Sequence, residues 1–279
     1  MVAAVTIGSD PEFFIRDTRT GGVVPIIGLL GGTKEEPLPI PHMDEGYAMQ
    51  EDNVMAEYNI PPMTTARGFA RAVCSAREAV VNFVRTKQDY LSADFGCSRL
   101  FPHFMLEHKQ AQVFGCSPDF DAHRQGEPLR PPEKAMMEEV DGEWRFAGGH
   151  VHIGYESAAP DFVAAALCDI YLGLPSVHSD KQGIRRQAYG SAGRYRPTKY
   201  GIEYRTLSNF WTFDREASMN VGSRAMTVGH LMSGDEDRLH TLFSEIPWID
   251  VVSAINDEDE QQAADLIVYC RNHLNMEGL

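Results

Sequence analysis

Several short segments place chemically reactive side chains two residues apart, the spacing at which side chains of a β-strand point to the same face. Asp10 and Glu12 form the first such pair. Two carboxylates on one face are typical ligands of a hard divalent cation. Asp10 is followed by proline, however, and Asp-Pro is also a common turn. The pair therefore indicates either a metal site or a solvated turn.

A second set of polar side chains lies in residues 48–59, which we expect to form one strand. Glu51, Asn53 and Glu57 have the same strand parity and would share a face of it. Oxygen ligands of this kind suit Mg²⁺ or Mn²⁺. The alternative is the polar, solvated face of an edge strand.

Two histidines, His150 and His152, also have strand spacing, and they are bracketed by Gly148-Gly149 and Gly154. Both imidazoles would face one way, and glycine lets a backbone approach a ligand closely. A lone histidine is more often structural. A His-x-His pair between glycines favours a functional role.

The last pair is Glu203 and Arg205, a carboxylate and a guanidinium that would share a face. At a surface such an ion pair contributes little to stability. The preceding chain is unusual, because residues 185–205 contain six Lys or Arg and one Glu in a protein of net charge −15. Guanidinium groups match phosphate oxygens, so this segment suits a polyphosphate. Its alternative is a solvated loop with Arg185, Arg186, Arg194 and Arg196 exposed.

Carboxylates, imidazoles and an arginine cluster, all on strands or their flanking loops, are together the groups that metal-assisted phosphoryl transfer requires. The elements that must position them follow from hydrophobic periodicity and turn residues. We expect one α+β domain over residues 1–279, with a sheet first, helices interleaved and a helical end. Expected strands are 2–7, 13–15, 48–59, a hairpin-like pair 144–146 and 150–154, and 202–207, and expected helices are 65–87, 161–173, 214–232, 236–245 and 258–274.

Composition excludes several classes of protein. The 279 residues are 43% hydrophobic and 23% charged, which is typical of a globular chain. The net charge of −15 argues against general nucleic-acid binding and against docking on anionic lipid. Much of that charge lies in residues 230–279, which hold 11 acids and 2 bases and which we interpret as a solvated helical surface.

The sequence contains no membrane span and no signal peptide that we recognise. The five cysteines are widely spaced and include no CxxC pair. This usage fits a reducing cytoplasm and excludes a cysteine-based zinc finger.

The order of these motifs resembles a known family. It is similar to the phage-encoded carboxylate–amine ligases (amidoligase type 2) of the glutamine synthetase and glutamate–cysteine ligase superfamily. The resemblance covers residues 5–213, the expected catalytic core, whereas the helical segment 214–279 carries no motif of the family. The shared segments are Gly8-Ser-Asp-Pro-Glu-Phe, Gly31-Gly-Thr-Lys34, Asp52-Asn-Val, Glu57-Tyr-Asn-Ile-Pro-Pro, Gly115-Cys-Ser-Pro-Asp119-Phe, Gly148-Gly-His-Val-His, Tyr189-Gly, Tyr195-Arg and Tyr200-Gly-Ile-Glu-Tyr-Arg205.

The resemblance implies a mainly antiparallel sheet curved into a half-barrel, with helices on its outer face and ATP and divalent cations on its concave face. It implies metal ligands at Asp10, Glu12, Glu51, Glu57, His150 and Glu203, and a position near the ATP phosphates for His152. Arg194, Arg196 and Arg205 match arginines that hold phosphate and substrate. Among the basic residues, Lys34, Arg185 and Arg186 are further candidate nucleotide contacts, although Gly31-Gly-Thr-Lys34 is too short for a P-loop.

The implied reaction uses ATP and Mg²⁺ or Mn²⁺ to activate a carboxylate as an acyl phosphate, which an amine then converts to an amide. Its partners would be small-molecule or peptide substrates, in the host cytoplasm if the chain is phage-encoded. One alternative is a cupin-like metal site of His150, His152 and Glu156, which have the required His-x-His-x₃-Glu spacing. Another is a non-catalytic phage protein on the same fold. The sequence identifies neither the substrates nor the oligomeric state.

Overall fold

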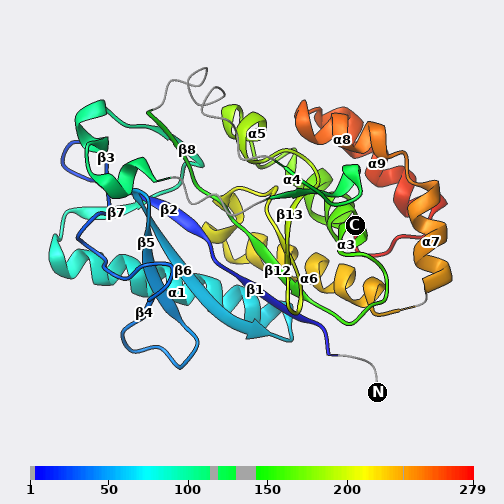
Figure 1. Ribbon diagram of the computed structural model, residues 1–279, viewed down its shortest axis with the longest axis horizontal. Helices are drawn as coiled ribbons and strands as arrows, with labels where there is room; N and C mark the ends of the chain where they lie inside the picture. The colour runs from blue at the N-terminus through cyan, green and yellow to red at the C-terminus, as the bar shows by residue number, and fades with distance from the viewer. Residues whose placement is uncertain (1–3, 114–118, 130–142, 235) are drawn as a thin grey trace.

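A computed structural model describes residues 4–113, 119–129, 143–234 and 236–279, and these residues form an α+β fold around one open sheet (Figure 1). Twelve strands of the described residues belong to the sheet, and their pairings are antiparallel. The central order is β10-β9-β13-β14-β12-β1-β6-β2-β3, with β5 and β4 added beside β6 and β7 beside β2. The expectation of a mainly antiparallel sheet that is not closed is confirmed. The strands are β1 (Thr6–Ser9), β2 (Glu12–Asp17), β3 (Val23–Val24), β4 (Leu38–Pro39), β5 (Ala48–Asp52), β6 (Met55–Met63), β7 (Leu91–Asp94), β9 (Phe120–Asp121), β10 (Glu127–Pro128), β12 (Val151–Gly154), β13 (Arg194–Thr198) and β14 (Gly201–Tyr204).

The centre of the sheet has one apolar face and one polar face, because side chains alternate along each strand. Ile7, Ile153 and Ile202 lie in register across β1, β12 and β14 and are buried on the apolar face. The next row across the same strands, and on to β13, is Gly8, His152, Glu203 and Arg196. This register places the chemically reactive residues on the face opposite the isoleucines.

Two long helices cover the apolar face. They are α1 (Ala66–Lys87) and α6 (Arg215–Met232), which pack against each other and against β6 and β12 respectively (Figure 1). Helix α1 begins where the Thr65 side chain accepts a hydrogen bond from Gly68 N, and it buries Phe69 against the ring of Trp211 at 5.5 Å. The expected helix 65–87 is confirmed, with Thr65 as its N-cap.

The remaining helices lie towards the C-terminal half. Helix α3 (Asp161–Cys168) continues as a π-helix, η4 (Asp169–Gly173), into α4 (Leu174–Ser176), so the expected helix 161–173 contains a wider turn. The C-terminal end is helical as expected, with a further helix between the last two predicted ones. The other helices are α5 (Ile184–Ala188), α7 (Glu236–Glu245), α8 (Trp248–Asn256) and α9 (Glu260–His273), and short 3₁₀ turns are η1 (His103–Leu106), η2 (Lys109–Gln112), η3 (Ala122–Arg124) and η5 (Asn209–Phe213). No helix of the described residues is long and apolar enough to cross a membrane.

Two strand predictions were wrong. The expected strand 48–59 is a hairpin, because Asn53 adopts a left-handed φ of 55° and turns the chain between β5 and β6. The expected hairpin of 144–146 with 150–154 does not form. Instead β11 (Trp144–Phe146) pairs with β8 (Ser98–Leu100) in a separate two-stranded sheet. The intervening glycines lead the chain from that small sheet into the large one.

Candidate active site

Three carboxylates from the two sides of the β5–β6 hairpin turn and from β2 form what we call the carboxylate cluster: Glu12, Asp52 and Glu57. One oxygen of each lies within 4.8 Å of the others. Glu12 lies directly opposite Glu57 in the β2–β6 pair. Asp52 reaches the same face because Gln50, two residues before it on β5, lies opposite Glu57. Each carboxylate of the cluster therefore comes from a different strand, Glu12 from β2, Asp52 from β5 and Glu57 from β6.

Burial makes this cluster electrostatically costly. Burial first, and then the neighbouring charge of Asp52, raise the pKa of Glu12 to about 8. Burial and the charges of Asp10, Glu12 and Asp52 also hold the pKa of Glu57 well above its ordinary value. Two donors offset part of the cost, since Gly148 N donates to Glu12 Oε2 at 2.7 Å and Gln50 Nε2 donates to Glu57 Oε2 at 2.7 Å. A bound cation would remove the remaining repulsion.

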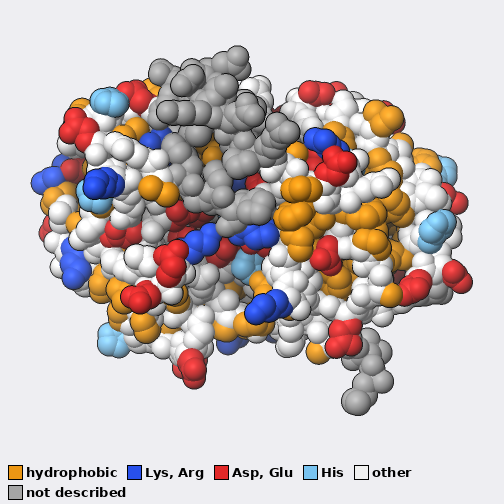
Figure 2. Space-filling view, in the orientation of Figure 1, with side chains coloured by type: hydrophobic (Ala, Val, Ile, Leu, Met, Phe, Trp, Pro, Cys, Tyr) orange, Lys and Arg blue, Asp and Glu red, His pale blue; other side chains and the backbone are white. Residues whose placement is uncertain are grey.

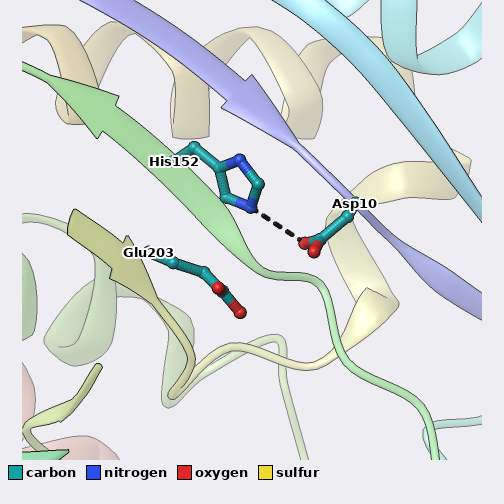
Figure 3. Close-up of side chains that lie close together, drawn as sticks. All are labelled: Asp10, His152 and Glu203. Atoms are coloured by element: carbon teal, nitrogen blue, oxygen red, sulfur yellow. Dashed lines mark ion pairs between the residues drawn. The ribbon is translucent and has the colours of Figure 1, made fainter. Parts of the chain in front are cut away.

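A second group, which we call the histidine cluster, consists of Asp10, His152 and Glu203, whose ligand atoms also lie within 4.8 Å of one another (Figure 3). Asp10 Oδ1 lies 3.1 Å from His152 Nε2. His150 borders the cluster, with Nδ1 3.4 Å from Asp10 Oδ1 and 3.5 Å from Glu203 Oε1. Together with the bordering His150, the cluster offers two carboxylates and two imidazoles, a donor set that many divalent metals accept.

The titration of the histidine cluster is dominated by its internal pairs. Burial raises the pKa of Asp10, but the charges and hydrogen bonds of His152 and His150 outweigh it and hold that pKa well below 3.8. Burial lowers the pKa of both histidines. At His152 the nearby Asp10 reverses this effect, so its pKa is raised, whereas the pKa of His150 stays lowered because Arg205 adds to the effect of burial.

A break between β1 and β2 brings the two clusters together. Both strands pair with β6, Ser9 opposite Ile60 and Glu12 opposite Glu57, and Tyr58 N donates to Pro11 O between them. Pro11 has no N–H, so the ladder is interrupted there. Asp10 occupies this interruption and contributes to the pKa of the acids on one side and of the histidines on the other.

Arginines line the other side of Glu203. Arg196, opposite Glu203 on the neighbouring strand, donates from Nη1 to Glu203 Oε2 at 3.0 Å. Arg205 Nη1 donates to Glu203 Oε1, and Arg205 Nε pairs with Asp119 at 2.9 Å. These partners outweigh burial and raise the pKa of Arg205. Nε and Nη2 of Arg196 are buried and have no hydrogen-bond partner among the residues that the structure describes, so they are available to an anion.

Arg194 stands beside these two without touching Glu203. Its backbone oxygen accepts from Arg205 N at 2.8 Å and its Nε donates to Ser191 Oγ at 2.7 Å. Burial lowers its pKa, against the opposing charges of Asp119 and Asp121. Figure 2 shows acidic, basic and histidine side chains close together near the centre of one face of the molecule.

Other residues that the sequence singled out lie elsewhere. Glu51 faces away from the carboxylate cluster, because it is one residue out of phase with Gln50 and Asp52 on β5. Its carboxylate instead accepts hydrogen bonds from the backbone N–H groups of Gly28, Leu30 and Gly31. Its position therefore fits a loop-stabilising residue better than a metal ligand.

The remaining candidate nucleotide contacts are not in either cluster. Arg185 is buried and donates to the backbone oxygens of Thr206 and Leu207 at 3.1 and 3.0 Å. Arg186 is buried as well and donates to Gly190 O. Lys34 is exposed on the loop before β4. Glu156, the third residue of the cupin-like alternative, is exposed beyond the end of β12 and is absent from both described clusters.

Sequence reasoning missed three residues of the site. Asp52 was missed because the hairpin turn was not recognised, although Asn53 is a residue type that favours such turns. Asp119 was quoted in a motif without a role; residues 115–118 of that motif lie outside the described residues. Tyr200, whose hydroxyl lies 3.1 Å from His152 Nδ1, had no sequence signal beyond its place in the Tyr200–Arg205 motif.

Comparison with protein families supports the resemblance seen in the sequence. Residues 143–250 match the family described as phage phiEco32-like COOH.NH2 ligase-type 2. The matched segment contains His150, His152, Glu203 and the arginines Arg194, Arg196 and Arg205. No curated protein matches the chain.

Proposed function

We propose that this chain, whose residues 143–250 match the phage phiEco32-like COOH.NH2 ligase-type 2 family, is an ATP-dependent ligase that joins a carboxylate to an amine. The observation that carries the proposal is the order of charges on one sheet face. The carboxylate cluster, the histidine cluster and the arginines follow one another across β6, β1, β12, β14 and β13. Cation ligands beside phosphate-binding groups are what phosphoryl transfer from ATP requires.

The residues present fit divalent cations. Glu12, Asp52 and Glu57 are close together, and no Lys or Arg of the described chain forms an ion pair with any of them. Carboxylate oxygens in this number suit Mg²⁺ or Mn²⁺. Asp10, His152 and Glu203 are candidates for a second ion, with His150 beside them. Bound ions would neutralise phosphate charge and so lower the barrier to transfer of the γ-phosphoryl group.

The arginines supply fixed positive charge to the phosphates. Arg205 is held between Glu203 and Asp119, which orients its planar guanidinium. Arg196 has two N–H-bearing nitrogens without a partner among the described residues, and both are sheltered from water. A phosphate oxygen would satisfy them, and a guanidinium can bind it with two parallel hydrogen bonds. Arg194 adds charge beside them.

In the proposed reaction a substrate carboxylate oxygen attacks the γ-phosphorus of ATP, and the bond to ADP breaks. The product is an acyl phosphate. The amine then attacks its carbonyl carbon, loses a proton and expels phosphate, which leaves the amide. Both substrates of the first step are anions, so arginines and cations are needed to offset their repulsion. We expect small-molecule or peptide substrates and a cytoplasmic location, where ATP is available.

The test is release of ADP from ATP and Mg²⁺ in the presence of pooled carboxylic acids and amines, including amino acids and peptides. Wild-type protein should release ADP only when both an acid and an amine are present, and amide products should appear by mass spectrometry. Glu57→Ala should release less than about a hundredth as much. Absence of ATP binding by calorimetry at millimolar Mg²⁺ would exclude this function. Binding without turnover on any pair would favour a non-catalytic protein on the same fold.

A further inference from the structure

The C-terminal helices contact the loop that leads to the site arginines, although the family match ends at residue 250. Helices α8 and α9 pack against α4, which directly precedes that loop (Figure 1). We call residues 178–192, which include α5, the α5 loop. The acidic turn between α8 and α9 contacts this loop. The acidic C-terminal segment therefore lies against the start of the basic segment 185–205.

Glu258 in that turn makes the central contact. Its Oε1 accepts hydrogen bonds from Gln182 N at 2.7 Å and from Gly183 N at 3.1 Å, directly before α5. The same oxygen lies 3.7 Å from Nε of Arg186, a side chain that is 1% exposed. Glu258 adopts a φ of 54°, a left-handed conformation that glutamate rarely takes. Its contacts therefore hold against a local conformational cost.

Two neighbours of Glu258 hold the ends of the α5 loop. Asn256 Oδ1 accepts a hydrogen bond from Ala192 N at 2.8 Å, two residues before β13 begins. Glu260 pairs with Lys181 at 2.5 Å and with His178 at 2.8 Å. The Glu260 pairs are exposed and contribute little stability. The anchor therefore depends mainly on Asn256 and Glu258.

The α5 loop in turn holds the backbone that follows Arg205. Arg185 donates to Thr206 O and Leu207 O, and Gln182 Nε2 donates to Thr206 O at 3.0 Å. Thr206 Oγ1 donates back to Ser191 O at 3.0 Å. A shift of the α5 loop would break these bonds, and the backbone on which the Arg205 side chain is mounted would lose its support.

We propose that Asn256 and Glu258 form a C-terminal anchor that fixes the α5 loop and, through it, the position of Arg205. Glu258 is thus a positioning residue: it lies outside the catalytic clusters and acts through α5 and the backbone of residues 205–207. The part of this inference that concerns Arg205 rests on the proposed ligase function, whereas the anchoring of the α5 loop does not.

Hydrogen–deuterium exchange of the full-length protein tests the anchor without any substrate. Glu258→Ala removes both backbone hydrogen bonds and leaves the buried Arg186 without its carboxylate, so peptides from 181–192 should exchange about tenfold faster than in wild type. Exchange in α1 should not change. Glu258→Gln keeps an oxygen acceptor and should exchange more slowly than Glu258→Ala. Glu245→Ala, an exposed acid at the end of α7, is the matched control and should behave as wild type.

The outcomes separate the anchor from general stability and from the ligase function. The anchor would be overturned if residues 181–192 of Glu258→Ala exchanged at the wild-type rate. It would also be overturned if exchange in α1 increased as much as exchange in 181–192 in both Glu258 variants. Calorimetry with ATP and Mg²⁺ tests the second step, with affinity expected to fall about three- to tenfold in Glu258→Ala and to recover in Glu258→Gln. Faster exchange with unchanged ATP affinity would overturn the positioning of Arg205. Absence of ATP binding in wild type would instead contradict the proposed function and leave the exchange result valid.

Discussion

Glu12 and Glu57 lie directly opposite each other across the antiparallel pair β2–β6, and each is at most 9% exposed. Like charges in this arrangement destabilise a sheet. Burial and the charges of Asp52 and Asp10 raise the pKa of both carboxyls, and at Glu57 the charge of Glu12 adds to this effect. One hydrogen bond to each opposes the rise, from Gly148 N to Glu12 and from Gln50 to Glu57. A fold that keeps such a pair at its centre is expected to trade stability for binding of a cation.

Substitution of Glu57 by glutamine should therefore stabilise the metal-free protein. Glu57→Gln removes one like charge and keeps an oxygen that Gln50 can reach. We expect the unfolding temperature in EDTA to rise by roughly 2–4 °C, which corresponds to about 1 kcal/mol. Millimolar Mg²⁺ should raise the unfolding temperature of wild type but not that of Glu57→Gln. Differential scanning calorimetry checks both statements, and a variant that is less stable in EDTA but retains the full Mg²⁺ gain would contradict them.

Glu51 and Asp52, neighbours on β5, should respond differently to substitution. The Glu51 carboxylate has two oxygens that accept hydrogen bonds from three backbone N–H groups, and Glu51→Gln leaves only one such oxygen. The variant should therefore lose about 1–2 kcal/mol of unfolding free energy but still be stabilised by Mg²⁺. Asp52→Asn should lose the Mg²⁺ gain, because it removes one charge of the carboxylate cluster. Urea unfolding with EDTA or Mg²⁺ distinguishes them. The opposite pattern would indicate that Glu51, and not Asp52, is a metal ligand.

Arg205 should not tolerate lysine. Arg205→Lys keeps the positive charge but loses the fork that pairs with Glu203 and Asp119 at the same time. We expect ATP-dependent ADP release to fall by about 100-fold or more, while the circular dichroism spectrum stays that of wild type. Arg215→Lys, an exposed arginine in the first turn of α6, is the matched control. Activity of Arg205→Lys within a few-fold of wild type would show that charge alone suffices.

His123 gives the stability a pH dependence. Its Nε2 lies 2.6 Å from Asp169, which is fully buried and also accepts from the Tyr204 hydroxyl at 2.6 Å. Burial lowers the pKa of His123, but the hydrogen bond and charge of Asp169 outweigh it, so the folded pKa lies above 6.5. The contribution of the pair is therefore complete below about pH 6.5 and is lost as the pH rises through the folded pKa.

The difference in unfolding free energy between wild type and His123→Gln should accordingly be larger at pH 6 than at pH 8.5. Denaturant unfolding at the two pH values measures it. Glutamine can still donate to Asp169, which makes it a suitable replacement. A difference that is constant or that grows with pH would contradict the assignment of the charged pair.

Much of the site was predictable from local pattern, for physical reasons that particular residues illustrate. His150 and His152, and Glu203 and Arg205, have their members two residues apart, and the period of a strand alone places each pair on one face. The sequence also determined that carboxylates, imidazoles and arginines occur on strands or beside them. The expected helix from residue 65 to 87 is also confirmed, because the helical spacing of its apolar residues can be read from neighbouring positions alone.

Only the tertiary structure decided which of these residues meet. Because of the turn at Asn53, Asp52 and not Glu51 lies beside Glu12 and Glu57. A shift of one residue along a strand moves a side chain to the other face of the sheet. Composition could not separate Arg185 and Arg186, which are buried against backbone oxygens, from Arg196 and Arg205, which face Glu203. The acidic C-terminal segment looked like solvated surface, yet Glu258 lies against the α5 loop more than 60 residues before it. Contacts between such distant segments depend on strand pairing and helix packing, which no local period encodes.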